Sequence, residues 1–154
     1  MNDKIRVLLS EEEVAKRIKE MGDVISSDYE GRPLHLICIL KGGVFFTCEL
    51  AKRISLPLTL DFMSVSSYGA GTVSSGIVKI VKDLDEPIEG KDVLIVEDII
   101  DSGNTLSYLI EVLKQRNPRS IELCTLLDKP ERRVKKQVTV KYTCFTVPDQ
   151  FIVG

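Results

Sequence analysis

Hydrophobic positions recur with the period of an α-helix in three segments of the chain. In the first, Ser10 and Glu13 match a capping box, and apolar residues then follow every three or four positions. This spacing predicts an amphipathic helix over residues 11–28. Two further helices are predicted, over Val44–Ile54 and over residues 103–116. In the former, three apolar side chains are available for the core, namely Phe45, Leu50 and Ile54.

Short apolar runs between these helices are typical of β-strands. They cover Leu34–Leu40, Leu58–Val65, Ile77–Val81, Val93–Val96, Ile121–Leu127 and Thr139–Val147. Strands that alternate with helices of this length predict right-handed βαβ units. We therefore expect a single α/β domain over residues 1–154, with a mostly parallel twisted sheet flanked by helices. In such sheets, ligands bind beyond the carboxyl ends of the strands.

The charge and hydropathy of the chain argue against several classes of protein. The net charge is −2 and the pI is about 5.5, whereas nucleic-acid-binding domains are usually basic. No apolar run approaches the ~20 residues that cross a bilayer, and residues 1–13 lack the features of a signal peptide. We expect a cytoplasmic protein that binds neither nucleic acid nor membranes.

The cysteines and the single histidine point to structural roles. Cys38, Cys48, Cys124 and Cys144 have apolar neighbours and no C-x-x-C spacing, which predicts buried reduced thiols rather than disulfides or a zinc site. His35 opens an apolar run and is expected to be structural. Nucleophilic mechanisms of the Ser-His or Cys-His type are therefore not expected.

The segment VLIVEDIIDSGNT, residues 93–105, carries the most specific chemistry. An apolar strand ends in Glu97 and Asp98, and a Ser-Gly-Asn-Thr turn opens the next helix. Such a turn directs backbone N–H groups and the helix dipole at one point, which suits a phosphate group. Taken alone, it also fits an ordinary strand-to-helix loop with an N-cap. It matches neither a Walker A loop nor the G-x-G-x-x-G dinucleotide motif.

The adjacent carboxylates favour a phosphorylated sugar as the ligand. Two acids beside a phosphate site repel the ligand unless Mg²⁺ or ligand hydroxyl groups intervene. A phosphorylated sugar offers a phosphate for the turn and vicinal hydroxyls for the acids. Asp101 would then lie close to the group that reacts at the anomeric carbon.

The same segment resembles the phosphoribosyl pyrophosphate motif of type I phosphoribosyltransferases, in the form typical of the hypoxanthine/guanine branch. Four further segments resemble motifs of that family, in the expected order and spread over nearly the whole chain. They are LKGG (Leu40–Gly43), SSYG (Ser66–Gly69), LLDKP (Leu126–Pro130) and VPDQFIVG (Val147–Gly154). The resemblance implies a Rossmann-like core with a small hood formed by the N- and C-terminal segments.

The resemblance also implies the reaction and its cofactor. The phosphoribosyl group of 5-phosphoribosyl 1-pyrophosphate would pass to N9 of hypoxanthine or guanine, giving IMP or GMP and pyrophosphate in purine salvage. Mg²⁺ is the implied cofactor, and Glu97 and Asp98 are the implied ligands of the metal and of the ribose hydroxyls. Asp101 is implied as the general base for the purine N7 proton. The 5′-phosphate would be bound by Asp101, Ser102, Gly103, Asn104 and Thr105.

Two segments are implied at the pyrophosphate. Lys41 and Gly42 are expected to flank a non-proline cis peptide bond that directs backbone donors at it. Ser67 and Tyr68 are expected to close over the reacting centre and exclude water.

The base is expected to be recognised by Lys129, Phe151 and Ile152. The Lys129 ammonium would donate to the 6-oxo group and meet only a donor on adenine, which discriminates against adenine. Phe151 is implied to stack on the purine, and Ile152 to contact it through its backbone. The other basic residues of this region are predicted to form a solvated face: Arg132, Arg133, Lys135, Lys136 and Lys141.

The family resemblance carries two expectations beyond the site. Relatives continue past the position of Gly154 with an aspartate, an arginine and a final hood strand, so the chain is expected to lack the family's C-terminal tail. A homodimer or homotetramer is also expected.

Two alternatives stay open at this point. One is a regulatory protein that keeps the phosphoribosyl pyrophosphate fold, senses a ligand and binds nucleic acid. The acidic pI and the presence of Asp101 and Lys129 argue against it. The other is a phosphoribosyltransferase for a different base. Lys129 and Phe151 argue against pyrimidines, but xanthine fits the same residues.

Overall fold

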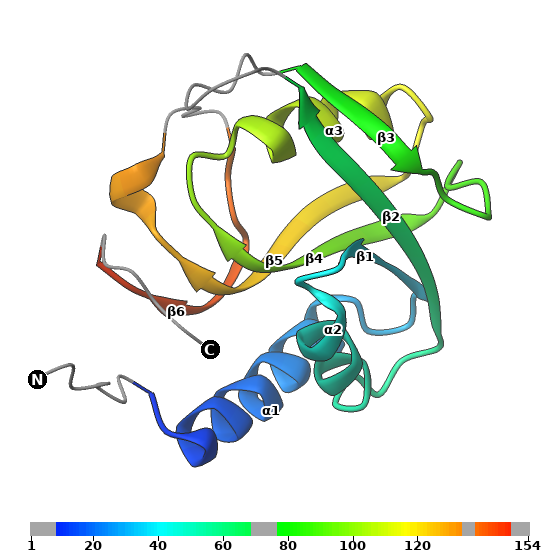
Figure 1. The fold of residues 1–154 in the computed structure, drawn as a ribbon. Coiled ribbons are helices and arrows are strands. Elements are labelled where there is room, and N and C mark those ends of the chain that lie inside the picture. The colour runs from blue at the N-terminus through cyan, green and yellow to red at the C-terminus, as the bar shows by residue number, and fades with distance from the viewer. Residues whose placement is uncertain (1–8, 69–76, 134–137, 149–154) are drawn as a thin grey trace, which may run out of the picture.

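The computed structural model describes residues 9–68, 77–133 and 138–148 (Figure 1). Helices and strands alternate over much of this range, as the hydrophobic pattern predicts. The elements are α1 (Glu11–Asp28), β1 (Leu34–Leu40), α2 (Val44–Ala51), β2 (Leu58–Tyr68), β3 (Ile77–Lys82), β4 (Asp92–Ile100), α3 (Asn104–Lys114), β5 (Ser120–Asp128), the 3₁₀ helix η1 (Pro130–Arg132) and β6 (Tyr142–Thr146). The segments implied for the hood, at the two ends of the chain, lie outside the described residues.

The described strands form one sheet in the order β3-β2-β1-β4-β5-β6. Strand β1 pairs in parallel with both β2 and β4, and the parallel pairing continues through β5 to β6. Strand β3 is antiparallel to β2. The predicted α/β fold with a mostly parallel sheet is therefore confirmed. The chain proceeds from β1 toward β2 on one side and from β4 toward β5 on the other. The strand order therefore reverses between the neighbouring strands β1 and β4. Such a reversal is a topological switch point, where open α/β sheets bind ligands.

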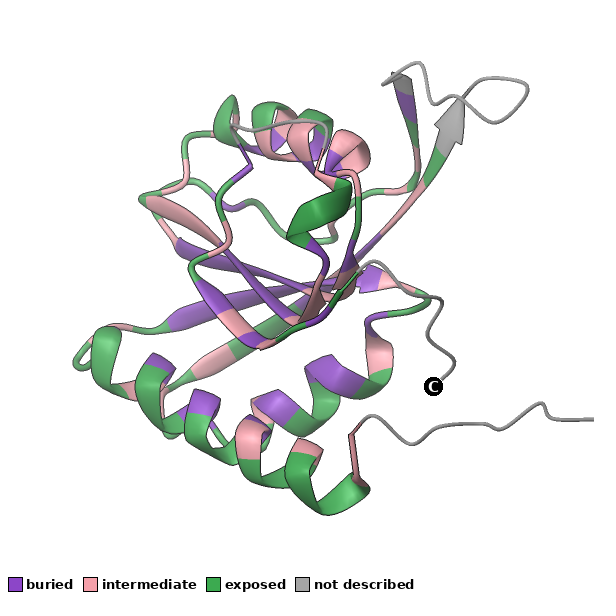
Figure 2. Cartoon of the chain, turned by 90° about the vertical axis from the view of Figure 1, so that its left-hand side faces the viewer, coloured by how far each residue is buried: buried purple, intermediate pink, exposed green. Residues whose placement is uncertain are grey.

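Helices cover both faces of the sheet. Figures 1 and 2 show α1 and α2 on one face and α3 on the other, with the buried positions between the layers. Strand β4 supplies side chains to both layers, because successive residues of a strand point to opposite faces. Leu94 and Val96 belong to the cluster under α1 and α2, whereas Val93 and Ile95 belong to the cluster under α3.

Helix α1 has the bounds that its sequence predicts. The Ser10 hydroxyl accepts the Glu13 backbone N–H at 3.1 Å, and the Glu13 carboxylate accepts the Ser10 N–H at 3.1 Å. This capping box satisfies two of the N–H groups that a helix start leaves without a partner. None of the helices in the described ranges is long and apolar enough to span a membrane.

Helix α2 differs from its prediction in length and in orientation. It ends at Ala51 rather than Ile54, because the next N–H groups, of Arg53 and Ile54, bond three residues back in a tighter turn. Phe45 was expected in the core but is 83% exposed, and its neighbour Phe46 is buried instead. The same rotation exposes Cys48, so the prediction of a buried thiol is wrong there. It is confirmed for Cys38, Cys124 and Cys144.

Other boundaries also shift, most of all in β4, which runs to Ile100 rather than to the predicted end at Val96 and so includes Glu97 and Asp98. Strand β2 runs to Tyr68, beyond the predicted end at Val65, because its last residues pair with β3. The last strand is shorter than the predicted Thr139–Val147, since β6 pairs with the final residues of β5 and spans Tyr142–Thr146. Helix α3 spans Asn104–Lys114, within the predicted 103–116.

Candidate active site

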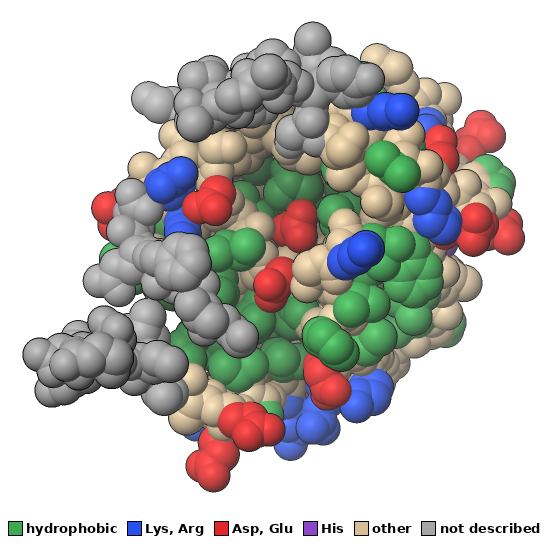
Figure 3. Space-filling model, viewed as in Figure 1, with side chains coloured by type: hydrophobic (Ala, Val, Ile, Leu, Met, Phe, Trp, Pro, Cys, Tyr) green, Lys and Arg blue, Asp and Glu red, His purple; other side chains and the backbone are tan. Residues whose placement is uncertain are grey.

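A cleft of about 310 Å³ opens at the carboxyl ends of β1 and β4. Figure 3 shows acidic side chains in the hollow at the centre of this face. The lining residues come from the ends of β1, β2 and β4 and from the start of α3: Ile39, Leu40, Val65, Glu97, Ile99, Ile100, Asp101, Ser102, Gly103, Thr105 and Leu106. The cleft therefore lies at the switch point of the sheet, as expected for a ligand site.

The turn between β4 and α3 has the geometry of an anion site. Gly103 is the N-cap of α3 and has a φ of 81°, a left-handed conformation that favours glycine. The N-cap residue offers no side chain, and the Ser102 hydroxyl accepts the Asn104 N–H at 3.3 Å. The start of the helix borders the cleft, so that the positive end of the helix dipole and the remaining first-turn N–H groups are available beside it. Asp101, Ser102, Gly103 and Thr105 line the cleft, and Asn104 is the first residue of the helix.

The turn after β1 lies against β4. The Leu40–Lys41 peptide bond is cis, so the expected cis bond between Lys41 and Gly42 is wrong by one position. No residue type marks a non-proline cis bond, and the sequence could not place it. A Cβ on Gly43 would lie 3.0 Å from the Ile39 carbonyl oxygen and 3.2 Å from that of Val96. A side chain here would be tight against both carbonyls, so glycine favours this approach, which holds the exposed Lys41 and Gly42 near the end of β4.

Among the described residues, no cation contributes to the pKa of Glu97 or of Asp98. Burial raises the pKa of Glu97 to about 7; the N–H of Asp98 opposes this shift and the negative charge of Asp98 adds to it. Burial also raises the pKa of Asp98. By the alternation along β4, Glu97 continues the face of Val93 and Ile95, while Asp98 continues the opposite face. Accordingly Glu97 lines the cleft, and Asp98 is not among the lining residues.

Lys129 lies beside Asp101, one of the residues that line the cleft. Strands β4 and β5 are in register at Ile100 and Asp128, and the Lys129 N–H donates to the Ile100 carbonyl at 3.0 Å. This register places the Lys129 Nζ 3.9 Å from an Asp101 carboxylate oxygen. Lys129 is buried, whereas the Asp101 side chain is about half exposed, at 47%. The structure thus brings together two residues that are 28 positions apart in the chain.

The other predicted site residues are placed in part or not at all. The backbone of Ser67 and Tyr68 pairs with Val78 and Ile77 at the end of β2, next to the cleft residue Val65. Their side chains and residues 69–76 lie outside the described part of the chain, as do Phe151 and Ile152. The roles of these residues stay predictions.

Sequence reasoning missed the role of Arg133, which was assigned to a solvated face. Its side chain is 13% exposed and ion-paired with Asp128, and its Nε donates to the Asp101 carbonyl at 3.3 Å. A basic run does not indicate which of its members turns inward. The apolar walls of the cleft, such as Leu40 and Leu106, were also missed as site residues. The available signal was their place at one edge of the sheet, Leu40 at the end of β1 and Leu106 in the first turn of α3.

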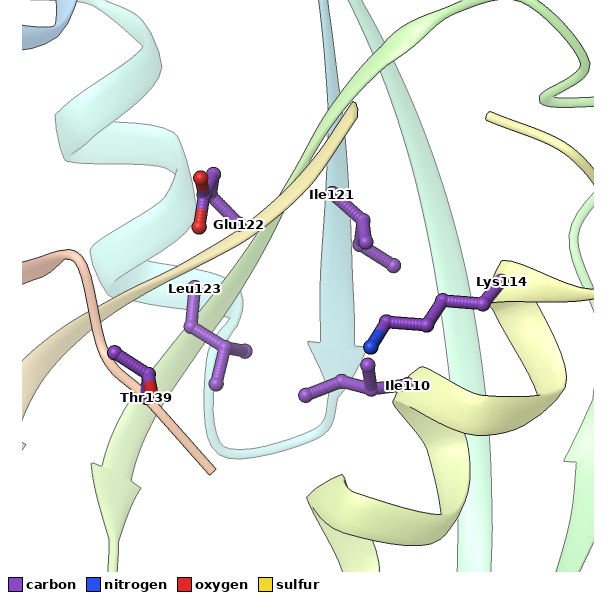
Figure 4. A pocket seen from close by; sticks show the side chains of 6 residues that line it. All are labelled: Ile110, Lys114, Ile121, Glu122, Leu123 and Thr139. Atoms are coloured by element: carbon purple, nitrogen blue, oxygen red, sulfur yellow. The ribbon is translucent and has the colours of Figure 1, made fainter. Parts of the chain in front are cut away.

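A second hollow, of about 200 Å³, lies between α3, β5 and the segment before β6. Figure 4 shows the side chains of its lining residues, which are Ile110, Lys114, Ile121, Glu122, Leu123 and Thr139. It lies at the end of α3 that presents carbonyl groups, and it contains a single carboxylate among its lining residues. The cleft at the switch point is therefore the better candidate for the active site.

The match to a family model identifies the class of protein. Residues 7–154 match the model of the phosphoribosyl transferase domain. The chain belongs to the phosphoribosyltransferase family, which confirms the resemblance seen in its motifs.

Known relatives narrow the likeness to one branch. The chain is 52% identical over 149 residues to the hypoxanthine-guanine phosphoribosyltransferase of Bacillus subtilis (strain 168), covering 97% of this chain and 82% of that protein. The crystal structure of a hypoxanthine phosphoribosyltransferase from Staphylococcus aureus superimposes with a TM-score of 0.93 at 48% identity, covering 97% of this chain and 81% of that one. The bifunctional protein TilS/HprT of Listeria monocytogenes serotype 4b (strain F2365) is 50% identical over 153 residues. The match covers 99% of this chain but 24% of the length of that relative.

Proposed function

We propose that this chain is a 6-oxopurine phosphoribosyltransferase that converts hypoxanthine or guanine, with 5-phosphoribosyl 1-pyrophosphate, to IMP or GMP and pyrophosphate. The observation that carries the proposal is the pair formed by Lys129 and Asp101 beside the phosphate-binding turn. An ammonium donor and a carboxylate acceptor stand 3.9 Å apart, and the carboxylate belongs to a residue that lines the cleft.

This pair matches one edge of a 6-oxopurine. O6 and N7 lie side by side on that edge of the base. The Lys129 ammonium can donate to O6, and the Asp101 carboxylate can accept the proton on N7. Adenine presents an amino donor in place of O6, which would face the Lys129 donor and lose its hydrogen bond. The pair therefore favours hypoxanthine and guanine over adenine.

The chemical step is a displacement at C1 of the ribose. N9 of the purine forms a bond to C1 as the bond from C1 to the pyrophosphate oxygen breaks, and the electron pair leaves with pyrophosphate. Asp101 takes the N7 proton, so that the product base is neutral. The N–H groups at the start of α3 hold the 5′-phosphate. Charge stabilisation in a preorganised site would supply most of the rate enhancement.

Mg²⁺ fits the acids at the end of β4. The pKa of Glu97 is raised to about 7 by burial and by the charge of Asp98, with no cation among its causes. A bound cation would offset both effects, and carboxylate oxygens are the ligands that Mg²⁺ prefers. Glu97, which lines the cleft, would hold the metal directly or through ribose hydroxyls and water, whereas Asp98, on the opposite face of β4, would reach it only through such bridging groups. When bound, Mg²⁺ would neutralise negative charge on the pyrophosphate.

A comparison of bases tests the proposal directly. The chain is incubated with 5-phosphoribosyl 1-pyrophosphate and Mg²⁺ and with hypoxanthine, guanine, xanthine, adenine or uracil in turn, and nucleotide formation is followed. We expect turnover of hypoxanthine and guanine, with adenine slower by at least 10³-fold. Equal or faster turnover of adenine would contradict the role of Lys129. If xanthine were the only base converted, the chain would be a xanthine phosphoribosyltransferase and the proposed substrates would be wrong.

We also propose that the active form is a homodimer or homotetramer. Phe45 on α2 is 83% exposed and Leu60 on β2 is 44% exposed, and an interface that covered them would remove apolar surface from water. Sedimentation equilibrium of the chain and of Phe45→Ser tests this, since the substitution should shift the assembly toward the monomer. A cytoplasmic location stays a prediction from the sequence.

A further inference from the structure

Arg133 lies where the two halves of the proposed purine site meet. Its guanidinium is ion-paired with the Asp128 carboxylate, and its Nε donates to the backbone carbonyl of Asp101 at 3.3 Å. Asp128 directly precedes Lys129, and Asp101 is the proposed general base. One side chain thus bridges the backbone of the base and the residue next to the purine-recognising lysine.

The bridge made by Arg133 is largely shielded from water and has a defined geometry. The side chains of Arg133 and Asp128 are 13% and 14% exposed. Hydrogen bonds between ionised groups are stronger than neutral ones, and they gain further when water is largely excluded. A planar guanidinium can bond two acceptors at once only in a fixed relative position, which an ammonium does not impose.

The stem of Arg133 also covers the phosphate-binding turn. A Cβ built on Gly103 would lie 3.0 Å from the Arg133 Cδ and 3.4 Å from a Val138 methyl group. The absence of a side chain at position 103 therefore lets Arg133 lie directly over the turn. The positive φ of Gly103 favours glycine at this position, and a side chain there would also displace the Arg133 stem.

We propose that Arg133 is a positioning residue for purine transfer. By holding the Asp101 carbonyl and the Asp128 carboxylate together, it sets the spacing between the Asp101 carboxylate and the Lys129 ammonium. Recognition of adjacent atoms on the base depends on that spacing, because small displacements of positioned groups cost large factors in rate. This inference rests on the proposed function and adds a residue to its site.

Kinetics of matched variants test the proposal. Arg133→Met keeps the aliphatic stem over Gly103 and removes the donors, and Arg133→Lys keeps the charge but cannot bridge both acceptors. We expect both variants to raise KM for hypoxanthine and to lower kcat by about tenfold or more, with KM for 5-phosphoribosyl 1-pyrophosphate changed by less than about threefold.

Arg116→Gln is the control, because it removes another arginine-aspartate pair, with Asp83, in which both nitrogen-oxygen distances are 2.8 Å. It should lower Tm and leave both KM values unchanged. If the Arg133 variants also change Tm alone, Arg133 is only a structural residue and the proposal is wrong.

Hydrogen exchange provides a readout that does not depend on turnover. The amides of residues 101–105 should exchange faster in Arg133→Met than in the wild-type chain or in Arg116→Gln. Unchanged exchange in that segment would overturn the proposal even if activity fell. If the wild-type chain itself forms no nucleotide and gains no Tm from IMP, the proposed function fails, and the role of Arg133 falls with it. Normal wild-type activity with unaltered Arg133 variants rejects the role of Arg133 alone.

Discussion

Asp61 in β2 and Glu97 in β4 are both acids within the sheet, yet their surroundings are opposite in kind. Asp61 is 3% exposed and accepts three backbone N–H groups, from Phe62 at 2.8 Å, Asp85 at 2.9 Å and Glu86 at 3.0 Å. Burial would raise the pKa of Asp61, but these donors and the nearby Lys82 outweigh it and lower the pKa. The carboxylate is therefore satisfied by the fold itself, and it anchors the turn between β3 and β4.

Glu97 receives much less from the protein. The Asp98 N–H donates to it at 3.2 Å, and burial together with the Asp98 charge still raises its pKa to about 7. Groups with pKa values perturbed in this way cluster at functional sites. The comparison shows that the fold itself supplies hydrogen-bond donors to the structural carboxylate of Asp61. At the switch point it supplies Glu97 with a single backbone donor, and a ligand and its cation would provide the remaining partners.

The largest effect should come from the acid that the proposed reaction uses directly. Asp101→Asn should lower kcat by about 10²–10⁴-fold, because the amide cannot take the N7 proton. The dissociation constant for 5-phosphoribosyl 1-pyrophosphate should change far less, since the turn donors are retained. Steady-state kinetics and calorimetric binding measure the two quantities. A variant that loses binding but keeps kcat would reverse the assignment.

The second test removes the satisfied acid. Asp61→Asn should lower the free energy of unfolding by about 2–3 kcal/mol, because an amide group replaces one acceptor oxygen with a donor opposite N–H groups. Urea denaturation at pH 7 measures the change. Asp85→Asn is the control, since the Asp85 side chain is 75% exposed and should change stability by less than about 0.5 kcal/mol. Equal losses of stability in the two variants would contradict the conclusion that the three backbone donors stabilise the Asp61 carboxylate.

The third test uses the titration of Glu97. Its folded pKa of about 7 lies above the ordinary value of 4.5, so the folded chain binds the proton more tightly than the unfolded chain does. The stability contributed by the protonated form is present below pH 4.5 and is lost as the pH rises toward 7. Relative to Glu97→Gln, the ligand-free wild-type chain should lose about 2 kcal/mol of unfolding free energy over this range. If the difference in unfolding free energy between the two proteins stayed constant from pH 4.5 to 7.5, the raised pKa of Glu97 would be contradicted.

The smallest effect is expected from His35. Its Nδ1 lies 2.6 Å from the Thr59 hydroxyl, and its buried Nε2 has no hydrogen-bond partner among the described residues. Burial, and then the charge of Lys91, lower its pKa. Stability should therefore be complete above the ordinary pKa of 6.5 and should decrease as the pH falls below it. His35→Gln in the Glu97→Gln background should reduce this decrease by less than about 1 kcal/mol. Urea titrations from pH 7.5 to 5 would reveal it, and a decrease that survives the substitution would have another source.

Much of the fold could be predicted because local pattern and tertiary packing agree in it. The capping box at Ser10 and the apolar spacing after it define α1 without help from other segments. The run Leu34–Leu40 is buried along nearly its whole length, as its composition predicts. The parallel order of strands follows from their alternation with helices, and this order places the turns after β1 and β4 at one edge.

The wrong predictions occur where the hydrophobic or charge pattern does not distinguish between neighbouring residues. Phe45 and Phe46 are both apolar, and only the packing of α2 on the sheet decides which of them is buried. Within the basic run, Arg133 turns inward because Asp128 and the Asp101 carbonyl lie within its reach. The end of β2 depends on pairing with β3, a non-local contact that composition at Ser66–Tyr68 does not reveal.

By itself, the sequence determined the alternation of helices and strands, the acidic stretch of β4 and the turn proposed to bind phosphate, because these depend on side-chain period and on turn chemistry. The tertiary structure decided which charges meet. The register of β4 with β5 places Lys129 beside Asp101, and the same register lets Arg133 bridge Asp101 and Asp128. The physical reason is that hydrophobic pattern specifies which face of an element is buried. Distances between side chains remote in the chain are set by strand pairing, which no local pattern encodes.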